Sequence, residues 1–374
     1  MDILSGKITI REIFKDHWES ILAKHKSQLP EYVVDTVNKM LACRDPQKLG
    51  YAKYSCPDHP EQVTVVPHSC KSRFCNTCGV LQTNKWMNKA LSLLPNTTFY
   101  HITFTVPDYL WYFFKEHIDV LDYLFKASAE TILGWFRQRR IIPAICSGLH
   151  SFGKNLKFNS HIHMIVSAGG TISSKGKYKW KSIKFMPYEK MIKIRFRTIL
   201  LKYLKPYLNY ELKELLYSLN WYVYVNMKVL DVTFTCRYIG RYTHKPALAE
   251  TRITDYDGCF VTFFYKEKDK PAISCKLTAE EFILKLIQHI LPPQFRVIRY
   301  YGLLANRTSK KFRKIISKLL KYIPKVPSLP RWRQRQIMSK GLDPLRCPVC
   351  GKEMLLIETA FFSKASGGLA YRFF

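Results

Sequence analysis

The sequence predicts an α+β or α/β fold, in which a sheet domain follows a small metal-binding module and precedes a basic helical region. Three observations lead to this fold class. Strand-like segments rich in β-branched and aromatic residues alternate with amphipathic segments of helical period. Five of the eleven cysteines lie between Cys43 and Cys78. The stretch from residue 294 to residue 325 is strongly basic.

The composition favours a nucleic-acid partner. The chain has 60 Lys and Arg against 28 Asp and Glu, a formal net charge of +32, which repels itself unless a polyanion binds. A membrane surface is the other polyanion. The sequence has no uninterrupted apolar run of spanning length and no cleavable signal pattern, which predicts a cytoplasmic protein without a membrane partner. The 14% aromatic share supplies both core volume and stacking platforms for unpaired bases.

The cysteines between residues 43 and 78 are spaced for a zinc ion. Two ligand pairs of two-residue spacing flank a strand-like VTVV segment, and such knuckles close a small fold around a tetrahedral ion. The predicted zinc ligands are Cys56, His59, Cys75 and Cys78. Cys70 is the first alternative, either as a ligand or as a small buried apolar residue. Cys43 and His68 are also within reach in the sequence.

A second cysteine pair lies near the end of the sequence. Cys347 and Cys350 form a CPVC motif that looks like half of a zinc ribbon. The motif either recruits ligands from elsewhere in the chain or binds no metal. The segment after Pro330 is expected to be a linker followed by a small appended unit.

The segments between the two cysteine regions predict a series of helices and strands. A helix is expected over 81–94, a strand over 97–106 and one long amphipathic helix over 108–140. A pair of strands follows over 144–154 and 161–170. The later elements are helices over 188–220, strands over 221–230 and 261–269, and a helix over 280–291.

His161 and His163 are separated by one residue in a predicted strand, so their side chains lie on one face. Neutral imidazole nitrogens can hold a divalent cation there. The alternative is a half-buried strand whose histidines are satisfied by hydrogen bonds. A cation held by two imidazoles needs further ligands. The candidates for a third ligand are His101, His150, Asn159 and His244, with His150 and His101 slightly ahead.

Tyr238 and Tyr242 lie one helical turn apart if the stretch around them is helical. Tyrosines at this spacing are usually packing residues, but beside a cation site in a basic protein they are candidate nucleophiles. An unperturbed tyrosine has a pKa of about 10, so its attack on an anionic phosphodiester requires a cation such as Mg²⁺ or Mn²⁺. Arg237 and Arg241 flank the tyrosines and are candidates to clamp phosphates.

The basic stretch over 294–325 is interleaved with aromatic residues. A charge run of this kind is ordinarily a solvated helix face, but the scarcity of acidic neighbours favours contact with phosphates. The basic residues concerned are Arg296, Arg299, Arg307, Lys310, Lys311, Arg313 and Lys314.

These motifs, in this order, resemble those of the HUH-type two-tyrosine rolling-circle transposases of bacterial insertion sequences, specifically the insertion-sequence ninety-one-like family. The resemblance covers nearly the whole chain, and its departure from the family pattern is His59, where a cysteine is common. The matching segments are 69–79, 101–107, 150–170, 237–253, 281–307 and 342–354.

The resemblance implies an α+β fold, in which an HUH endonuclease domain has a central antiparallel sheet with flanking helices. It assigns a divalent cation to His161 and His163, and the nucleophiles to Tyr238 and Tyr242. The implied reaction nicks single-stranded DNA at element ends and leaves a 5′-phosphotyrosine. The expected domains are a helical and zinc-binding module over 1–95, a catalytic domain over 96–265, a basic helical DNA-binding region over 266–330 and a tail over 331–374.

Two other function classes stay open at this stage. A replication initiator or relaxase shares the HUH chemistry, but the zinc module and the lack of a helicase P-loop in the sequence favour a transposase. A non-enzymatic zinc-finger protein that binds nucleic acid explains the charge and the cysteines, and makes both catalytic motifs accidental. The family implies a bacterial, nucleoid-associated protein whose partners are mainly single-stranded element ends and target DNA.

Overall fold

The chain forms two compact units, each assembled from separate stretches of sequence in the computed structural model. The first unit contains Met1–Gln82, Leu248–Leu284 and Ser328–Phe374, and the second contains Thr83–Ala247 and Lys285–Pro327. The segment 331–374, expected as a tail, therefore lies within the first unit. The structure describes residues 8–175, 177–229, 233, 236, 240, 247–266, 270–321, 330–363 and 367–374.

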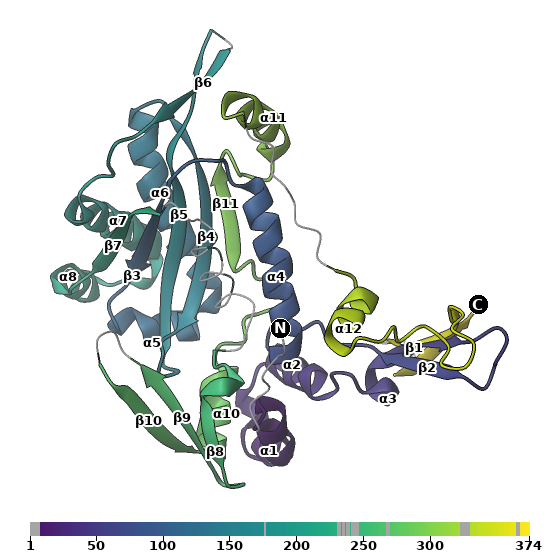
Figure 1. The fold of residues 1–374 in the computed structure, drawn as a ribbon. Helices are drawn as coiled ribbons and strands as arrows, with labels where there is room; N and C mark the ends of the chain where they lie inside the picture. The colour runs from purple at the N-terminus through teal and green to yellow at the C-terminus, as the bar shows by residue number, and fades with distance from the viewer. Residues whose placement is uncertain are drawn as a thin grey trace. The chain divides into compact units, whose positions relative to one another are not determined.

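The second unit is built on a six-stranded antiparallel sheet (Figure 1). Its strands lie in the order β11-β4-β5-β3-β7, and β6 pairs with β5 outside that path. The strand that carries His161 and His163 is β5, at the centre of the order. The strands are Phe99–Thr105 (β3), Ile142–Phe152 (β4), Phe158–Ser174 (β5), Lys177–Ser182 (β6), Tyr222–Val229 (β7) and Ile298–Gly302 (β11). The mixed helix and antiparallel-sheet class is confirmed.

Helices α5 to α8 accompany this sheet, and the largest core of the unit lies between them and one sheet face (Figure 1). These helices are Tyr109–Glu116 (α5), Leu121–Gln138 (α6), Glu189–Leu204 (α7) and Tyr210–Ser218 (α8). Ile162 and Met164 of β5 pack in this core with Phe125 of α6 and Phe196 of α7, and all four are fully buried. Successive side chains of a strand alternate between faces, so the residues between them point the other way.

A second core lies on the opposite face of the sheet, against α4 and α11. These helices are Asn76–Leu93 (α4) and Ser309–Leu319 (α11). Trp86 of α4 and Phe312 of α11 pack in one cluster with Ile165 of β5. Ile165 is an even number of positions from His161 and His163, so the histidine pair lies on this second face.

In the described part of the first unit there are four further helices and two small antiparallel sheets. The helices are Ile10–His25 (α1), Glu31–Leu41 (α2), Pro46–Leu49 (α3) and Trp332–Lys340 (α12), while α10 (Ala279–Ile287) continues into the second unit. One sheet has the strand order β13-β12-β1-β2. Its strands are Gly50–Ser55 (β1), Val63–Pro67 (β2), Leu355–Ser363 (β12) and Gly368–Phe373 (β13). The other sheet has the strand order β10-β9-β8. Its strands are Ile253–Tyr256 (β8), Phe260–Lys266 (β9) and Ala272–Thr278 (β10). Short 3-10 turns lie at Lys26–Gln28, Ile118–Val120, Lys205–Tyr207 and Glu250–Arg252.

Most of the predicted elements are confirmed, since α4, β3, β4, β5, α7, α8, β7, β9 and α10 overlap their predicted ranges. The single helix expected over 108–140 is wrong. The backbone leaves the helical region at His117, with φ −116° and ψ 68°, and α6 begins only at Leu121. The His117 ring contacts the rings of Phe113 and Tyr207, so the break is held by aromatic packing that no sequence period reports.

The region 266–330, expected to be helical, also contains β10 and β11. Strand β11 pairs with β4 at the edge of the large sheet, with Ile298 opposite Gly148. The Ile and Tyr residues of β11 favour a half-buried strand. Pairing with β4 therefore decides the structure here, although a helical region was expected from the basic residues around β11. No helix among the residues that the structure describes is long and apolar enough to cross a bilayer.

We expect Gly302→Ala to disrupt the pairing of β11 with β4. Gly302 has φ +61°, and a Cβ added to it would lie 1.9 Å from the Pro143 carbonyl oxygen, which also accepts the Leu303 N–H at 2.9 Å. Strain and the steric clash should together lower the free energy of unfolding by about 2 kcal/mol or more, measured by chemical denaturation. Gly368→Ala is the control, because a Cβ there meets no atom within 4 Å. Equal unfolding midpoints for the two variants would contradict this interpretation.

Candidate functional site

The antiparallel pairing of β4 with β5 brings three histidines together on one sheet face. His150 lies directly opposite His161, and Gly148 lies opposite His163. Residues opposite one another in an antiparallel ladder share a face. One nitrogen from each of His150, His161 and His163 lies within 4.8 Å of the other two. We call these three residues the histidine cluster; it adds His150, one of the candidates for a third ligand, to the two-residue motif seen in the sequence.

Hydrogen bonds orient the rings of the histidine cluster. His161 Nδ1 lies 2.8 Å from the backbone oxygen of Asn159, so Nδ1 carries the proton and Nε2 carries the lone pair that can ligate a metal. The ring centroids of His150 and His163 are 4.1 Å apart, and those of His161 and His163 are 4.9 Å apart. An oriented imidazole backed by a carbonyl is the usual arrangement of a metal-binding histidine.

The structure separates the candidates for the third ligand. His150 belongs to the cluster, whereas His101 lies behind His163, with its Nε2 2.9 Å from His163 Nδ1. Thr103 Oγ1 lies 3.2 Å from the same Nδ1. The Asn159 backbone oxygen contacts His161 Nδ1, and its side-chain Oδ1 is buried, so its role as a ligand stays a prediction. His244 lies outside the described residues.

Burial keeps these imidazoles in the neutral form that metals bind. Burial lowers the pKa of His161 and of His101 to about 4. Burial, followed by repulsion from His150, His161 and His101, holds the pKa of His163 well below its ordinary value. Within the described chain the cluster contains no carboxylate. A set of three imidazoles suits a transition ion such as Mn²⁺ better than Mg²⁺, which prefers oxygen ligands.

The stretch that carries the predicted nucleophiles is described at only three positions. Tyr238, Tyr242, Arg237 and Arg241 lie outside the described residues, while Thr233, Cys236 and Gly240 are helical. Cys236 is fully buried in the core that contains Trp86 and Ile165. The Gly240 carbonyl accepts the Thr83 hydroxyl at 3.2 Å, and a Cβ at Gly240 would lie 2.9 Å from the Trp86 ring. The positions that bracket Tyr238 are therefore anchored on α4, on the sheet face that carries the histidine cluster.

Four cysteines of the first unit form a buried cluster that corrects the predicted zinc ligands. The members are Cys43, Cys70, Cys75 and Cys78. Their sulfurs lie 3.5 Å apart for Cys70 and Cys78, 3.7 Å for Cys43 and Cys78, and 3.8 Å for Cys43 and Cys75. Zn–S bonds of about 2.3 Å in a tetrahedron place sulfurs about 3.8 Å apart, so this four-cysteine cluster has the dimensions of a zinc site.

Cys56 and His59, predicted to share an ion with Cys75 and Cys78, lie in a different group with Cys347 and Cys350. The β1–β2 hairpin separates the two knuckles that their spacing had suggested to be partners. Cys70, the first alternative in the sequence, joins the four-cysteine cluster together with Cys43. The sequence contained a signal for that cluster, because Cys43 and Cys70 flank the hairpin. The spacing of the five cysteines and two histidines did not by itself show which four share an ion.

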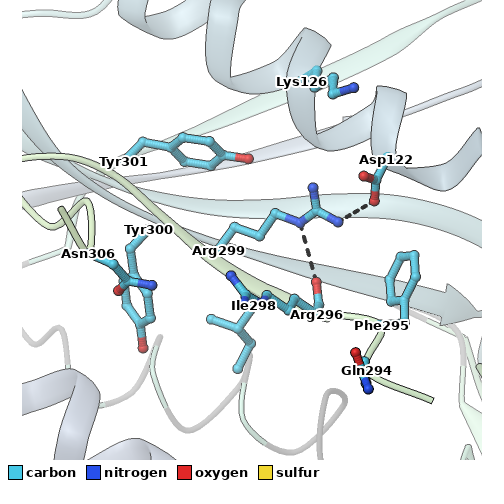
Figure 2. A pocket seen from close by; sticks show the side chains of 10 residues that line it. All are labelled: Asp122, Lys126, Gln294, Phe295, Arg296, Ile298, Arg299, Tyr300, Tyr301 and Asn306. Atoms are coloured by element: carbon cyan, nitrogen blue, oxygen red, sulfur yellow. Dashed lines mark hydrogen bonds and ion pairs between the residues drawn. The ribbon is translucent and has the colours of Figure 1, made fainter. Parts of the chain in front are cut away.

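Arg299, a predicted DNA contact, lines a pocket of about 510 Å³ in which it already has protein partners (Figure 2). Its guanidinium forms an ion pair with Asp122 of α6 and lies 4.2 Å from the ring centre of Phe125. Its Nε donates to the Arg296 carbonyl oxygen at 3.3 Å. These contacts give Arg299 a structural role, and its DNA contact stays a prediction. Arg307, in the turn before α11, is exposed.

The fold and site define an α+β protein that combines a zinc-binding domain with a histidine cluster on a central antiparallel sheet. Residues 13–106 match the family described as "Transposase zinc-binding domain", and residues 145–312 match the family described as "Putative transposase". The chain belongs to the insertion-sequence ninety-one-like (IS91/IS801) family of transposases, as the sequence resemblance indicated. Membership implies that the protein binds DNA.

Two relatives align with almost the whole chain. The transposase for insertion sequence element IS801 of Pseudomonas savastanoi pv. phaseolicola is 28% identical over 360 residues, which cover 90% of this chain and 86% of the relative. The "Putative transposase y4qJ" of Sinorhizobium fredii (strain NBRC 101917 / NGR234) is 26% identical over 383 residues, which cover 93% of this chain and 94% of the relative. The comparison with solved structures gave no significant match.

Arg299 and Arg307 are expected to respond differently to replacement by alanine. Arg299→Ala should lower the free energy of unfolding by about 1 kcal/mol, because it removes a half-buried ion pair and the contact with Phe125. Arg307→Ala should leave stability unchanged and weaken DNA binding, with a salt dependence shallower by about one unit. Denaturation midpoints and binding titrations at several salt concentrations measure the two effects. A stability loss only in Arg307→Ala would reverse the assignment.

Proposed function

We propose that this transposase nicks single-stranded DNA at element ends through a 5′-phosphotyrosine intermediate and then transfers the strand. One observation carries the proposal. The histidine cluster and the anchored positions on either side of Tyr238 lie on the same face of one sheet, which is the arrangement that a cation-assisted tyrosine attack requires. We assign the nucleophiles to Tyr238 and Tyr242, as the family resemblance implies.

The architecture supports an HUH endonuclease domain. His161 and His163 lie on the central strand of an antiparallel sheet with helices on both faces, as that domain requires. We assign His150 as the third protein ligand, because its nitrogen completes the cluster from the neighbouring strand. We assign His101 and Thr103 to positioning, since both contact the Nδ1 edge of His163.

The proposed reaction balances without a nucleotide cofactor. The tyrosine oxygen forms a bond to phosphorus while the bond between phosphorus and the 3′ oxygen breaks. The proton that the phenol loses is matched by the proton that the departing 3′ oxygen gains, which leaves a free 3′ hydroxyl. The phosphotyrosine bond conserves the energy needed for rejoining. His150, His161 and His163 would hold a divalent cation, which would supply positive charge to offset that of the phosphate.

A pair of exposed tyrosines near the histidine cluster supports a single-stranded substrate. Tyr222 and Tyr224 of β7 are 48% and 54% exposed, and their rings are parallel within 3°, with centroids 6.2 Å apart. Tyr224 lies opposite Thr103, which lies opposite His163, so both tyrosines are on the face of the histidine cluster. Two strand spacings, about 10 Å, separate them from it. A base next to the scissile phosphate can stack on them only if it is unpaired.

The basic face of α11 supplies further phosphate contacts. Phe312 and Ile316 of this helix are buried in the second core, which fixes the direction of its opposite side. Five basic residues of the helix are exposed, namely Lys310, Lys311, Arg313, Lys314 and Lys318. Exposed basic residues bind phosphates by releasing counterions, and their contribution to affinity does not depend on the base sequence. We assign this face to DNA affinity, and the histidine cluster with the tyrosines to chemistry.

The proposed function predicts a covalent adduct. Wild-type protein incubated with a labelled single-stranded end oligonucleotide and Mn²⁺ should form a species that survives a denaturing gel. Tyr238→Phe and Tyr242→Phe should each lose cleavage or strand transfer, and the double variant should lose the adduct. Tyr210→Phe, on the exposed surface of α8, is the matched control. An adduct that persists in the double variant rules out these nucleophiles.

The same assay separates the cation site from DNA affinity. His161→Ala should abolish the adduct and leave oligonucleotide binding largely intact, because phosphate contacts elsewhere supply affinity. Loss of binding together with the adduct would make the histidine cluster structural. Detection of nicking without any adduct would instead indicate hydrolysis by water.

The tyrosine platform predicts a binding effect specific to unpaired DNA. Tyr222→Ala and Tyr224→Ala should each weaken binding of a single-stranded oligonucleotide by about tenfold, because a stacked base contributes about 1–3 kcal/mol. Binding of a duplex of the same sequence should change little. Tyr188→Ala, whose side chain is 83% exposed elsewhere in the second unit, is the control. Equal losses for single-stranded and duplex DNA in fluorescence titrations would refute the stacking role.

A further inference from the structure

We infer a second zinc site, separate from the four-cysteine cluster, that joins two distant parts of the sequence. Its ligands are Cys56, His59, Cys347 and Cys350. The match to the transposase zinc-binding domain covers residues 13–106, so it contains the first two of these ligands and not the last two. Cys56 and Cys350 are 294 positions apart in the sequence. The CPVC motif, which looked like half of a zinc ribbon, finds its other half in the β1–β2 hairpin.

The distances within this group fit a tetrahedral ion. The sulfurs of Cys56 and Cys350 are 3.5 Å apart. His59 Nδ1 lies 3.8 Å from the Cys56 sulfur and 3.9 Å from the Cys347 sulfur. Zinc bonds of about 2.3 Å to sulfur and about 2.0 Å to nitrogen place such ligands about 3.5–3.8 Å apart. A disulfide between Cys56 and Cys350 would need the sulfurs at about 2.05 Å, and it would leave His59 without a role.

The backbone at both knuckles is shaped to present the ligands. After Cys350 the chain turns at Gly351, with φ +69°, and the Gly351 N–H donates to the Cys347 carbonyl oxygen at 2.9 Å. The Cys347 N–H donates in turn to the Lys352 carbonyl oxygen at 2.9 Å. The first knuckle closes in a similar way, because the Cys56 N–H donates to the Gln62 carbonyl oxygen at 3.2 Å. Each pair of ligands is therefore held by its own tight turn.

The sheet beside this site supplies a reason for a metal. Strand β12 pairs with β1 so that Leu355 lies opposite Ser55, next to the ligands. An ion pair of 2.6 Å between Lys352 and Asp58 connects the two knuckles. Among the residues that the structure describes, the apolar cluster at this end contains Cys56, Cys347 and Met354, with Tyr54 packed against it. A core of that size cannot by itself hold a four-stranded sheet together, and small modules of this kind commonly depend on a metal.

Zinc content tests the second site in the full chain. Wild-type protein should hold one zinc ion in each of the two cysteine-containing groups, besides any zinc taken up by the histidine cluster. The double variant Cys347→Ser, Cys350→Ser should lose one ion, and Cys43→Ser, Cys78→Ser should lose the other. Cys259→Ser, which removes an exposed cysteine outside both groups, should lose neither. A wild-type content of one zinc ion, or the same zinc content in Cys347→Ser, Cys350→Ser as in wild type, would overturn the inference.

A second measurement does not depend on a variant that lacks a ligand. With cobalt in place of zinc, His59→Cys should keep the metal and shift the visible absorption to longer wavelength, because sulfur replaces nitrogen at one site only. In the wild-type protein under reducing conditions, the exposed Cys350 should resist alkylation until a chelator is added, whereas the exposed Cys259 should react at once. Equal alkylation of both cysteines in the zinc-loaded protein would contradict the site.

Discussion

The pairing of β4 with β5 is the constraint on which the candidate catalytic site depends. Side chains along a strand alternate between two faces, so a slip of one residue would move His150 to the other face of the sheet. The observed register sets His150 opposite His161 and Gly148 opposite His163. The same alternation sends Ile162 and Met164 into the core of α6 and α7. Burial on one face therefore fixes the position of the histidine cluster on the other.

The protein keeps its positive charge and its candidate metal-binding histidines in different environments. His161 and His163 of the histidine cluster are neutral, because burial lowers the pKa of His161 to about 4 and holds the pKa of His163 well below its ordinary value. The basic residues of α11 stay exposed, since the helix buries only its apolar side. A chain with a formal charge of +32 can therefore attract a polyanion with its surface and still offer uncharged nitrogens to a cation. Arg299 differs from the basic residues of α11, because its positive charge forms an ion pair with Asp122.

The cysteine-rich regions show why spacing in the sequence identifies candidate metal ligands more easily than it identifies which ligands share one ion. Each Cys-x2-Cys or Cys-x2-His turn presents two ligands, but one ion needs two such contributions. The β1–β2 hairpin carries Cys56 and His59 away from Cys75 and Cys78, which instead meet Cys43 and Cys70. The proposed second site then draws on Cys347 and Cys350 because β12 pairs with β1. Ligand sets are thus decided by strand pairing between distant segments.

The sequence by itself determined the family, the mixed helix and sheet class and the motif His161-x-His163, because composition, period and block order are local properties of the chain. Only the tertiary structure decided that His150 joins that pair while His101 stands behind it. The tertiary structure also decided that the candidate zinc ligands form two groups, and that Ile298–Gly302 forms a strand. These outcomes depend on which distant strands pair and in which register, and a residue's own neighbours in sequence carry no record of that choice.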